Sequence, residues 1–545
     1  MIMAHAARDV RAAEEPLLAQ ERAFSGGLMD RAATALAGTV RRRLVVRRGR
    51  VVGSTVVALV GPGNNGGDAL HALAHLAGRG VRCVAVLTSA EVHGGGLAAL
   101  TDRGATVLAL VDGAPGRRVW VGDALAEAVA ADVVLDGLLG IGARGPLREP
   151  AAELVRLLGE LLDRELAGTG KRADALLPEV VAVDVPSGIG VDDGTVPGPV
   201  LRADRTVTFG TAKPGLLLPP AAALAGELEL VDLGLAATLA ADAAVRRLVA
   251  DDVPGLWPVP GRTAHKYTRG VVGVVAGTST YPGAAVLTVA GAQGAGCGMV
   301  RYVGPDRVRD AVLAAHPEVV TGGDTDVRVQ AWVLGPGLDP ADEEQAARAR
   351  SVLERLGAAG RPEGRVPVVV DAGALALLPD RVPPRVVLTP HAGELARLLS
   401  SRGTEVSRDD VDAEPLRHAR AAHEATGATV LLKGAVTVVV GPGGTWSQAD
   451  APAWLATAGA GDVLAGVLGA VLAGRAGARG GPGGRAGGDP ARADDEVAVS
   501  AALAALVHGR AAHRACPGGP VTAGDVARAL PGTIADLLAG GGRAR

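Results

Sequence analysis

A glycine-rich turn that contains an acid follows the first β-branched run of the chain. Residues 61–70 read GPGNNGGDAL, and Gly61, Gly63 and Gly66 have the G-x-G-x-x-G spacing of dinucleotide-binding turns, which is a weak signal by itself. Asp68 is expected in the first turn of the helix that follows, where a carboxylate suits the helix dipole but would repel a pyrophosphate. Asp68 is therefore either a structural acid at a helix start or a group that does chemistry.

Two further motifs of the N-terminal half also follow predicted strands. DGLLGIGARGP begins at Asp136, and DVPSG begins at Asp184. Ligands of open α/β sheets bind at the carboxyl ends of strands, so all three motifs should face one site. Their carboxylate, amide and hydroxyl oxygens suit a hard cation, and the low ligand charge favours a monovalent ion, although the residues alone leave open whether any cation binds. The oxygen-bearing side chains are Asn65, Asp136, Asp184 and Ser187.

In the C-terminal half, a run of small residues opens a long apolar helix. Residues 455–474 read LATAGAGDVLAGVLGAVLAG. Small residues at 458–461 let successive backbone N–H groups point at one anion, and the helix N-terminus adds positive potential. This pattern predicts an anion hole for a phosphoryl group, in which Asp462 takes a proton from an attacking hydroxyl. The alternative is a glycine-rich N-cap followed by an ordinary helix-start acid.

Other strand ends in this half indicate a nucleotide site. LTPHAGE (388–394) and GPGL (335–338) directly follow predicted strands, and DAG (371–373) ends another. Lys433 ends a fourth strand and enters a hairpin, where its ammonium could meet a diphosphate. Four strands thus deliver polar or glycine-rich ends to one edge of one sheet. Taken alone, His391 fits a structural histidine better than a binding residue.

Lysine is rare in this chain, with only four lysines among 55 basic residues. Arginine carries a wide planar fork, whereas lysine carries a compact point charge. Lys213, Lys266 and Lys433 each lie in a Gly/Pro-rich turn beside a predicted strand. We therefore expect arginine to be unacceptable at these positions, with retention by chance as the alternative.

These motifs need strands that bring them to one edge of a sheet. Short β-branched runs in the sequence can form such strands. Such runs alternate with Ala/Leu-rich helical stretches in both halves, a pattern that predicts parallel sheets covered by helices on both faces. A hairpin is expected late in the second series, and one or two amphipathic helices over residues 17–43. The predicted strands are Thr55–Val60, Val81–Leu87, Thr106–Leu110, Asp132–Leu135, Val180–Val183, Val271–Ala276, Met299–Val303, Ala331–Leu334, Val368–Val370, Val386–Leu388, Thr429–Leu432 and Val436–Val440.

Length and composition exclude several classes of protein. The 545 residues suggest two large or three ordinary domains, and 48% apolar residues exclude wholesale disorder. A formal net charge of −3 argues against a general nucleic-acid binder. The three cysteines, Cys83, Cys297 and Cys516, are too far apart for a metal cluster or a disulfide framework. Without a signal-peptide pattern or a run of 18 apolar residues, we expect a soluble cytoplasmic protein with no membrane partner.

Two segments interrupt the alternation of strands and helices. The Pro/Gly cluster VPGLWPVPGR indicates a domain junction, so we expect domains at 1–240 and 261–545, joined by a linker at 241–260. Residues 475–495 form a low-complexity Gly/Arg/Pro stretch that cannot bury a core. We expect this stretch to be a disordered insertion between helices.

The N-terminal motifs GPGNNGGD, the D-x-L-x-G-x-G-x-x-G-P run at 136–146 and DVPSG together resemble the NAD(P)H-hydrate epimerase domain, over roughly residues 10–235. The resemblance implies a Rossmann-like three-layer sandwich that interconverts the R and S hydrates, with K⁺ bound by Asn65, Asp136 and Ser187. Proton transfer makes Asp184 the first candidate acid/base and Asp68 the second. Ala69 stands where the family usually has glycine. The implied substrate-binding residues are Asn64, Asn65, Gly66, Gly67, Asp68, Gly140, Ile141, Gly142, Ala143, Arg144, Gly145, Pro146 and Asp184.

The C-terminal half resembles the ribokinase-like superfamily and, within it, the ADP-dependent NAD(P)H-hydrate dehydratase, over about residues 260–530. The motifs that match are HKYTRGVVGVVAG, YPGAAVLTVAGAQGAG, GPG, LTPHAGE, LLKGA and ATAGAGDVLAG. The resemblance implies a ribokinase-like three-layer sandwich in which ADP, or ATP in some relatives, phosphorylates the S hydrate, with Mg²⁺ bridging the phosphates. Gly373 departs from the family, in which a second aspartate is usual. The implied hydrate contacts are Ala284, Gly337, His391 and Asp462, and the implied nucleotide contacts are Lys433, Gly434, Ala435, Val436, Thr437 and Gly461.

Together the halves predict one α/β enzyme that repairs both epimers of hydrated NADH and NADPH, since a dehydratase specific for one epimer leaves the other stranded. A homo-oligomer is expected for both families. Three alternatives stay open. The C-terminal half could be a kinase of the hydroxymethylpyrimidine or thiazole type, and the N-terminal half could be a conventional Rossmann dehydrogenase or a binding module without activity.

Overall fold

Buried side chains along the N-terminal strands alternate between two apolar layers, one on each face of the sheet. The computed structural model describes residues 1–21, 25–169, 177–322, 324–356, 366–479 and 490–540. From β2 (Thr55–Val60), Val56, Ala58 and Val60 join a core with α2 (Leu28–Arg48) and α3 (Asn64–Ala77). Val57 and Leu59 join a second core with α5 (Val121–Val129) and α6 (Ala151–Thr169), on the opposite face of the sheet.

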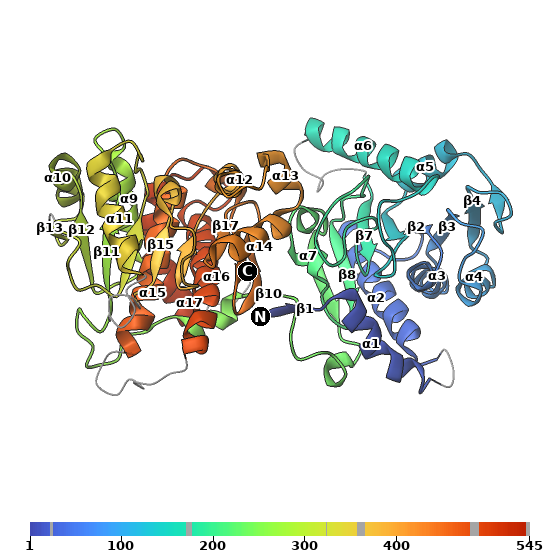
Figure 1. Ribbon diagram of the computed structural model, residues 1–545. Helices are drawn as coiled ribbons and strands as arrows, with labels where there is room; N and C mark the ends of the chain where they lie inside the picture. Colours follow the sequence, from blue (N-terminus) through green and yellow to red (C-terminus); the bar gives the residue numbers. More distant parts are fainter. Residues whose placement is uncertain (22–24, 170–176, 323, 357–365, 480–489, 541–545) are drawn as a thin grey trace. The chain divides into compact units, whose positions relative to one another are not determined.

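This sheet has eight strands in the order β5-β4-β3-β2-β6-β7-β8-β9, and every described pair is parallel. Because helices cover both faces, as Figure 1 shows for α5 and α6 against α2 and α3, the unit is a three-layer α/β sandwich. The remaining elements are α1 (Ala7–Leu18), β3 (Arg82–Leu87), α4 (Gly94–Thr101), β4 (Thr106–Ala109), β5 (Arg117–Arg118), β6 (Val133–Gly137), β7 (Glu179–Val183), β8 (Arg205–Phe209), α7 (Pro214–Leu217) and β9 (Glu227–Val231).

The C-terminal sheet has eleven strands in the order β1-β10-β19-β18-β17-β16-β15-β14-β11-β12-β13. The described pairs are parallel except at β17–β18 and β18–β19, so the late hairpin is confirmed. The strands are β1 (Ile2–Ala4), β10 (Val245–Arg247), β11 (Val271–Val275), β12 (Met299–Val303), β13 (Val320–Gly322), β14 (Ala331–Leu334), β15 (Val368–Val370), β16 (Val386–Leu388), β17 (Thr429–Leu432), β18 (Thr437–Gly441) and β19 (Gly444–Gln448).

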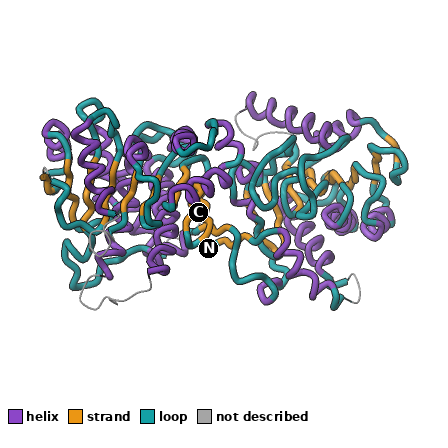
Figure 2. Tube along the Cα trace, viewed as in Figure 1, coloured by secondary structure: helices purple, strands orange, loops and turns teal. Residues whose placement is uncertain are grey.

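Helices cover both faces of this sheet as well, and Figure 2 shows the orange strands enclosed by purple helices. One face packs against α9 (Pro282–Gly294), α15 (Ala460–Arg479), α16 (Pro490–Ala515) and α17 (Ala523–Leu538). The other elements are α8 (Val253–Leu256), α10 (Asp306–Ala315), α11 (Glu343–Arg355), α12 (Ala392–Ser401), α13 (Arg408–Ala413) and α14 (Pro415–Thr426). Two three-layer sandwiches confirm the predicted α/β class.

The chain divides into one unit of residues 3–244 and another of residues 245–545 together with Met1 and Ile2. Most of the expected linker, residues 241–260, instead belongs to the C-terminal unit. There β10 pairs in parallel with β19 at Arg246 and Trp446, and α8 follows β10. Residues 475–479 and 490–495, expected in a disordered insertion, are the end of α15 and the start of α16. Residues 480–489 lie outside the described residues.

Helix α15 is the central helix of its core. In the described ranges, one helix, Ala460–Ala478, is long and apolar enough to cross a membrane by length and composition. Within that window 78% of the residues are buried inside the unit, as in the core helix of a globular domain. Helices α9 and α15 meet at backbone level, because a Cβ at Gly466 would lie 2.1 Å from the Thr288 carbonyl oxygen.

We predict that Gly466→Ala lowers the free energy of unfolding of the C-terminal unit by about 1–3 kcal/mol, because the added methyl group overlaps the backbone of α9. Gly283→Ala, on the same pair of helices but facing open space, is the matched control and should be neutral or slightly stabilising. Urea unfolding followed by tryptophan fluorescence measures both variants. Equal stability of the two variants would contradict this packing.

Candidate functional site

The three N-terminal motifs lie at the carboxyl ends of neighbouring strands. In the sheet, β2, β6, β7 and β8 stand side by side and run in parallel, so their carboxyl ends share one edge. Backbone contact closes this edge: a Cβ at Gly61 would lie 1.9 Å from the Leu138 carbonyl oxygen, and a Cβ at Gly66 would lie 2.3 Å from the Gly61 carbonyl oxygen. The glycines of the turn are therefore required by sterics.

Asp136, Ser187 and Asn65 meet around one backbone carbonyl at this edge. The Asp136 carboxylate is fully buried and accepts hydrogen bonds from Ser187 Oγ at 2.6 Å and Ser187 N at 2.8 Å. Ser187 Oγ lies 3.2 Å from the Leu139 carbonyl oxygen, to which Asn65 Nδ2 donates at 3.0 Å. Burial raises the pKa of Asp136, and the Ser187 bonds oppose that shift. Leu139 is a member of this cluster that the sequence reasoning missed.

Asp184 is held by the last two residues of β8 and by Lys213, which follows that strand. Lys213 Nζ donates to the Asp184 carboxylate, and Thr208 Oγ1 and Phe209 N donate to the same oxygen at 3.2 Å each. Asp184 has a φ of +66°, a conformation that non-glycine residues rarely adopt. The sequence reasoning singled out Lys213 as a retained lysine but did not place it in a site.

Asp68 lies in the second turn of α3, not in the first as expected, because the helix already begins at Asn64. Burial raises the pKa of Asp68 well above its ordinary value, and the negative charges of Asp184 and Glu14 add to the shift, while Lys213 opposes it. The pKa of Glu14, on α1, is also raised by burial and by Asp184, with Lys213 opposing. Three carboxyl groups therefore share one environment with Lys213, and nothing local in the sequence distinguishes Glu14 from other helix acids.

The other predicted substrate residues of this unit lie in two segments beside these groups. Residues 64–67 form the first turn of α3, and residues 140–146 form a loop directly after the Leu139 carbonyl. The Arg11 guanidinium donates to the Ile141 carbonyl oxygen at 2.8 Å, which attaches α1 to that loop. Both segments therefore border the same edge of the sheet as Asp136 and Asp184.

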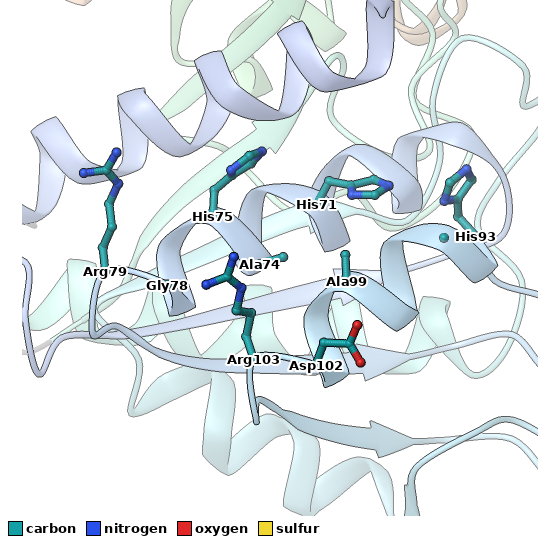
Figure 3. Close-up of a pocket in the computed structure, with 10 residues that line it drawn as sticks. His71, Ala74, His75, Gly78, Arg79, His93, Ala99, Asp102 and Arg103 are labelled. Carbon is teal, nitrogen blue, oxygen red and sulfur yellow. The ribbon is translucent and has the colours of Figure 1, made fainter. Parts of the chain in front are cut away.

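A separate groove of about 910 Å³ lies between α3 and α4, and Figure 3 shows the side chains that line it. The rings of His71 and His93 meet edge to face with centroids 5.5 Å apart. Burial lowers the pKa of His71 to about 4, with the neighbouring His93 and His75 adding to the shift. Within the described ranges, no group of three or more His, Cys, Asp or Glu side chains is arranged to hold a metal ion. None of the predicted site residues lines this groove.

The C-terminal site begins at the N-terminus of α15, where Asp462 lies in the first turn as expected. Burial raises the pKa of Asp462 to about 7, with the charges of Asp371 and Glu394 adding to the shift and Lys433 opposing it. Lys433 Nζ donates to Asp371 Oδ1 at 2.8 Å and lies 3.8 Å from Glu394 Oε2. A Cβ at Gly461 would lie 3.3 Å from Lys433 Nζ, so the ammonium borders the small-residue turn directly.

The charge on Lys433 is stabilised by its neighbours. Burial alone would lower the pKa of Lys433, but Asp371 and Glu394 outweigh burial, and the pKa lies above its usual value. Lys433 directly follows β17 and begins the loop of residues 433–436, which leads into β18. The structure thus brings predicted nucleotide residues Lys433 and Gly461 together, and adds Asp371 and Glu394, which the sequence reasoning did not assign.

His391 caps α12, with Nδ1 accepting from Gly393 N at 3.0 Å and Glu394 N at 3.3 Å. This capping is the structural role that the residue alone suggests, and its side chain remains half exposed next to the bridge between His391 and Lys433. The two other predicted hydrate residues touch each other, because a Cβ at Gly337 would lie 2.5 Å from the Ala284 Cβ.

Gly373 replaces the aspartate that is usual in the resembled family, and its surroundings leave no room for a side chain. A Cβ at Gly373 would lie 2.0 Å from the Leu338 carbonyl oxygen. The acidic group at this strand end is therefore Asp371 alone, which is 2% exposed and paired with Lys433.

Comparisons with known proteins match both units. A family model described as NAD(P)H-hydrate dehydratase matches residues 272–527, and a model described as YjeF-related protein N-terminus matches residues 25–215. The chain is 43% identical over 474 residues to a bifunctional NAD(P)H-hydrate repair enzyme of Mycobacterium tuberculosis, which covers 85% of this chain and 88% of the relative. It is 42% identical to the corresponding Mycobacterium leprae enzyme over the same shares.

Among solved structures, an ADP/ATP-dependent NAD(P)H-hydrate dehydratase from Bacillus subtilis, co-crystallised with ATP and Mg²⁺, is 24% identical. It covers 54% of this chain and 99% of its own, with a TM-score of 0.43. With both family models matched and more than 40% identity over most of each curated relative, the chain belongs to the family of bifunctional NAD(P)H-hydrate repair enzymes.

Proposed function

We propose that the N-terminal unit interconverts the R and S hydrates of NADH and NADPH, and that the C-terminal unit dehydrates the S hydrate. The second reaction consumes ADP and yields NAD(P)H, AMP and phosphate. One observation carries the proposal: in each unit an aspartate with a raised pKa lies beside a lysine–aspartate ion pair at the carboxyl ends of parallel strands. Such groups are suited to proton transfer near neutral pH.

In the N-terminal unit, Asp68 and Asp184 divide the acid and base roles. Epimerisation must break and re-form a bond at the hydroxyl-bearing carbon, and each half of the exchange moves a proton. Asp68 keeps its proton at higher pH than an ordinary carboxyl because it is buried beside Asp184 and Glu14. Asp184 is instead paired with the Lys213 ammonium. Two carboxyl groups in such different environments suit a proton donor and a proton acceptor.

The oxygen cluster around Leu139 fits K⁺. Asp136 is a fully buried carboxylate that receives hydrogen bonds from Ser187, and no lysine or arginine pairs with it among the described residues. A buried charge without a cationic partner is costly, and carboxylate, hydroxyl, amide and carbonyl oxygens are ligands that a hard cation accepts. Asn65, Asp136 and Ser187 would hold the ion, which supplies a fixed positive charge beside the substrate loops.

In the C-terminal unit, Asp462 accepts the proton of the hydrate hydroxyl as that oxygen bonds to the terminal phosphorus of ADP and the bond to AMP breaks. The backbone N–H groups at the start of α15 and the Lys433 ammonium lie next to each other and bind the transferred phosphoryl group. Phosphate then leaves with the hydroxyl oxygen, the neighbouring ring carbon loses a proton to solvent, and the electron pair of that C–H bond forms the double bond of the reduced nicotinamide. His391, Ala284 and Gly337 border the hydrate.

A Mg²⁺ ion bound with the nucleotide would neutralise charge on its phosphates. The carboxylates of Asp371 and Glu394, next to Lys433, are oxygen ligands of the kind that Mg²⁺ accepts, so the site fits the ion. We further infer that the protein works in the cytoplasm as a homo-oligomer on small molecules, without a nucleic-acid partner, which suits its net charge of −3.

The pKa of Asp462 predicts the pH dependence of dehydration. Only the ionised carboxylate accepts a proton, so kcat/KM should fall about tenfold per pH unit below about pH 7, where Asp462 becomes protonated. Asp462→Asn should lower kcat by about 10²–10⁴-fold. Asp525→Asn, which removes an exposed helix-start acid of the same unit, is the control and should leave kcat unchanged. The measurement is NADH formation from purified S hydrate with ADP. An unchanged acidic limb in Asp462→Asn would contradict this assignment.

The proposed K⁺ site predicts cation-dependent epimerisation. With R hydrate as substrate and no nucleotide, the appearance of S hydrate should accelerate with K⁺ and respond little to Li⁺. Ser187→Ala should raise the K⁺ concentration needed, because one oxygen ligand is lost. Ser54→Ala is the control, since this buried serine lies at the opposite, amino end of β2. Chromatographic separation of the epimers follows the exchange. Equal rates in K⁺ and Li⁺ would argue against the ion.

A further inference from the structure

Lys213 is a deeply buried cation of the N-terminal site. Its side chain is 1% exposed, and its ammonium donates to three oxygens: the Asp184 carboxylate, Thr208 Oγ1 at 3.1 Å and the Phe209 carbonyl at 2.9 Å. Each of the three N–H donors of the Lys213 ammonium therefore has an oxygen acceptor. Burying an ammonium is costly unless it is paired and fully hydrogen-bonded. The surroundings of Lys213 are therefore built around its charge.

The acceptors explain why lysine is retained at this position. The three oxygens converge on a single nitrogen, which suits a compact ammonium, whereas an arginine fork spreads its donors over a plane. Lys213 is also one of only four lysines in the chain. The positive charge at position 213 is therefore bound by these three acceptors and is not a surface charge.

The partner of Lys213 is held in an unusual conformation. Asp184 has a φ of +66°, and its backbone N donates to the Val207 carbonyl oxygen at 2.8 Å. Strained backbone at a site persists only where the surroundings over-determine it. The bonds from Lys213, Thr208 and Phe209 to the Asp184 carboxylate fix the direction in which it points.

The charges around Asp184 leave Lys213 as its close cation. The charge of Asp184 contributes to the raised pKa values of Asp68, on α3, and of Glu14, on α1. Arg11, also on α1, acts on Glu14 and donates to the Ile141 carbonyl. Without the ammonium, three carboxyl groups would share a poorly solvated space.

We propose that Lys213 is a positioning residue of the epimerase reaction, which orients the Asp184 carboxylate so that it can accept a proton. The proposal rests on the proposed function of this site. Lys213 acts through Asp184, so its removal should matter only while Asp184 is present.

A double-mutant cycle on the full-length chain tests this coupling. The variants are Lys213→Met, Asp184→Asn and the double variant, with epimer exchange of R hydrate measured across neutral pH without nucleotide. Lys213→Met should lower kcat by about 10²-fold with little change in KM, and should move the acidic limb of the kcat profile to higher pH. Asp184→Asn should be at least as slow, and the double variant should be no slower than Asp184→Asn alone, within about threefold.

Two further variants sharpen the test. Lys213→Arg should recover less than a tenth of the lost rate, because the fork does not match the three acceptors. Arg82→Met removes a surface ion pair between Arg82 on β3 and Glu127 on α5, and should leave the exchange unchanged. If Lys213→Met fails to fold, the double variant compared with Asp184→Asn still decides, because it removes both buried charges together.

The outcomes separate this proposal from the proposed function. Wild-type exchange in Asp184→Asn would overturn the proposed role of the site itself. Loss of exchange in Asp184→Asn together with an unchanged rate and pH profile in Lys213→Met would overturn the role of Lys213 alone. If the double variant exchanges the epimers more slowly than Asp184→Asn by the full factor lost in Lys213→Met, the role of Lys213 is also overturned. Lys213 would then act independently of Asp184.

Discussion

A lysine paired with an aspartate at the end of a parallel strand is the interaction on which both sites of this chain depend. Lys213 pairs with Asp184 after β7, and Lys433 pairs with Asp371 after β15. In each case a further aspartate, Asp68 or Asp462, lies nearby with a pKa raised by burial. Desolvation favours the protonated form of the second acid, and the lysine keeps the number of uncompensated charges small enough for the site to fold.

The two ion pairs differ in how fully the lysine ammonium is buried and bonded to protein oxygens. Lys213 is 1% exposed and gives all of its donors to protein oxygens, so it can only orient Asp184. Lys433 is 21% exposed and borders Gly461 at the start of α15, where an incoming phosphate would sit. The same type of ion pair therefore suits the two proposed roles, which are orientation of a proton acceptor in one unit and phosphoryl binding in the other.

Glycines bring the two pairs close to the turns that complete each site. Gly61 lies against the Leu138 carbonyl, and Gly335 has a φ of +108° with a Cβ position 1.9 Å from the Asp371 carbonyl oxygen. Only a residue without a side chain permits this approach. Gly373 follows the same rule, since the Leu338 carbonyl occupies the space that a side chain would need.

The sequence predicted the features that depend on local pattern. Thr55–Val60, Met299–Val303 and Ala331–Leu334 are strands with the expected bounds, because short runs of mostly apolar residues that include valine or aromatic side chains favour strands. The grouping of Asp136 with Ser187 followed from parallel strand ends.

Features that depend on distant parts of the chain were missed. Strand β8 was not anticipated, because Thr206 and Thr208 are polar yet buried in it. Asp68 was placed one turn too early because the glycine turn itself, from Asn64, is already helical. The pairing of Lys213 with Asp184 joins residues 29 apart in sequence, and only the parallel register of β7 and β8 brings them together.

The central claim is that one chain restores both epimers of a damaged cofactor. The most direct test supplies the full-length protein with a mixture of R and S NADH hydrates, ADP, Mg²⁺ and K⁺, and follows the near-ultraviolet absorbance of the reduced nicotinamide. If both units act as proposed, absorbance recovers until both epimers are consumed. Recovery that stops when the S hydrate is exhausted would contradict the epimerase half of the account, and no recovery would contradict the dehydratase half.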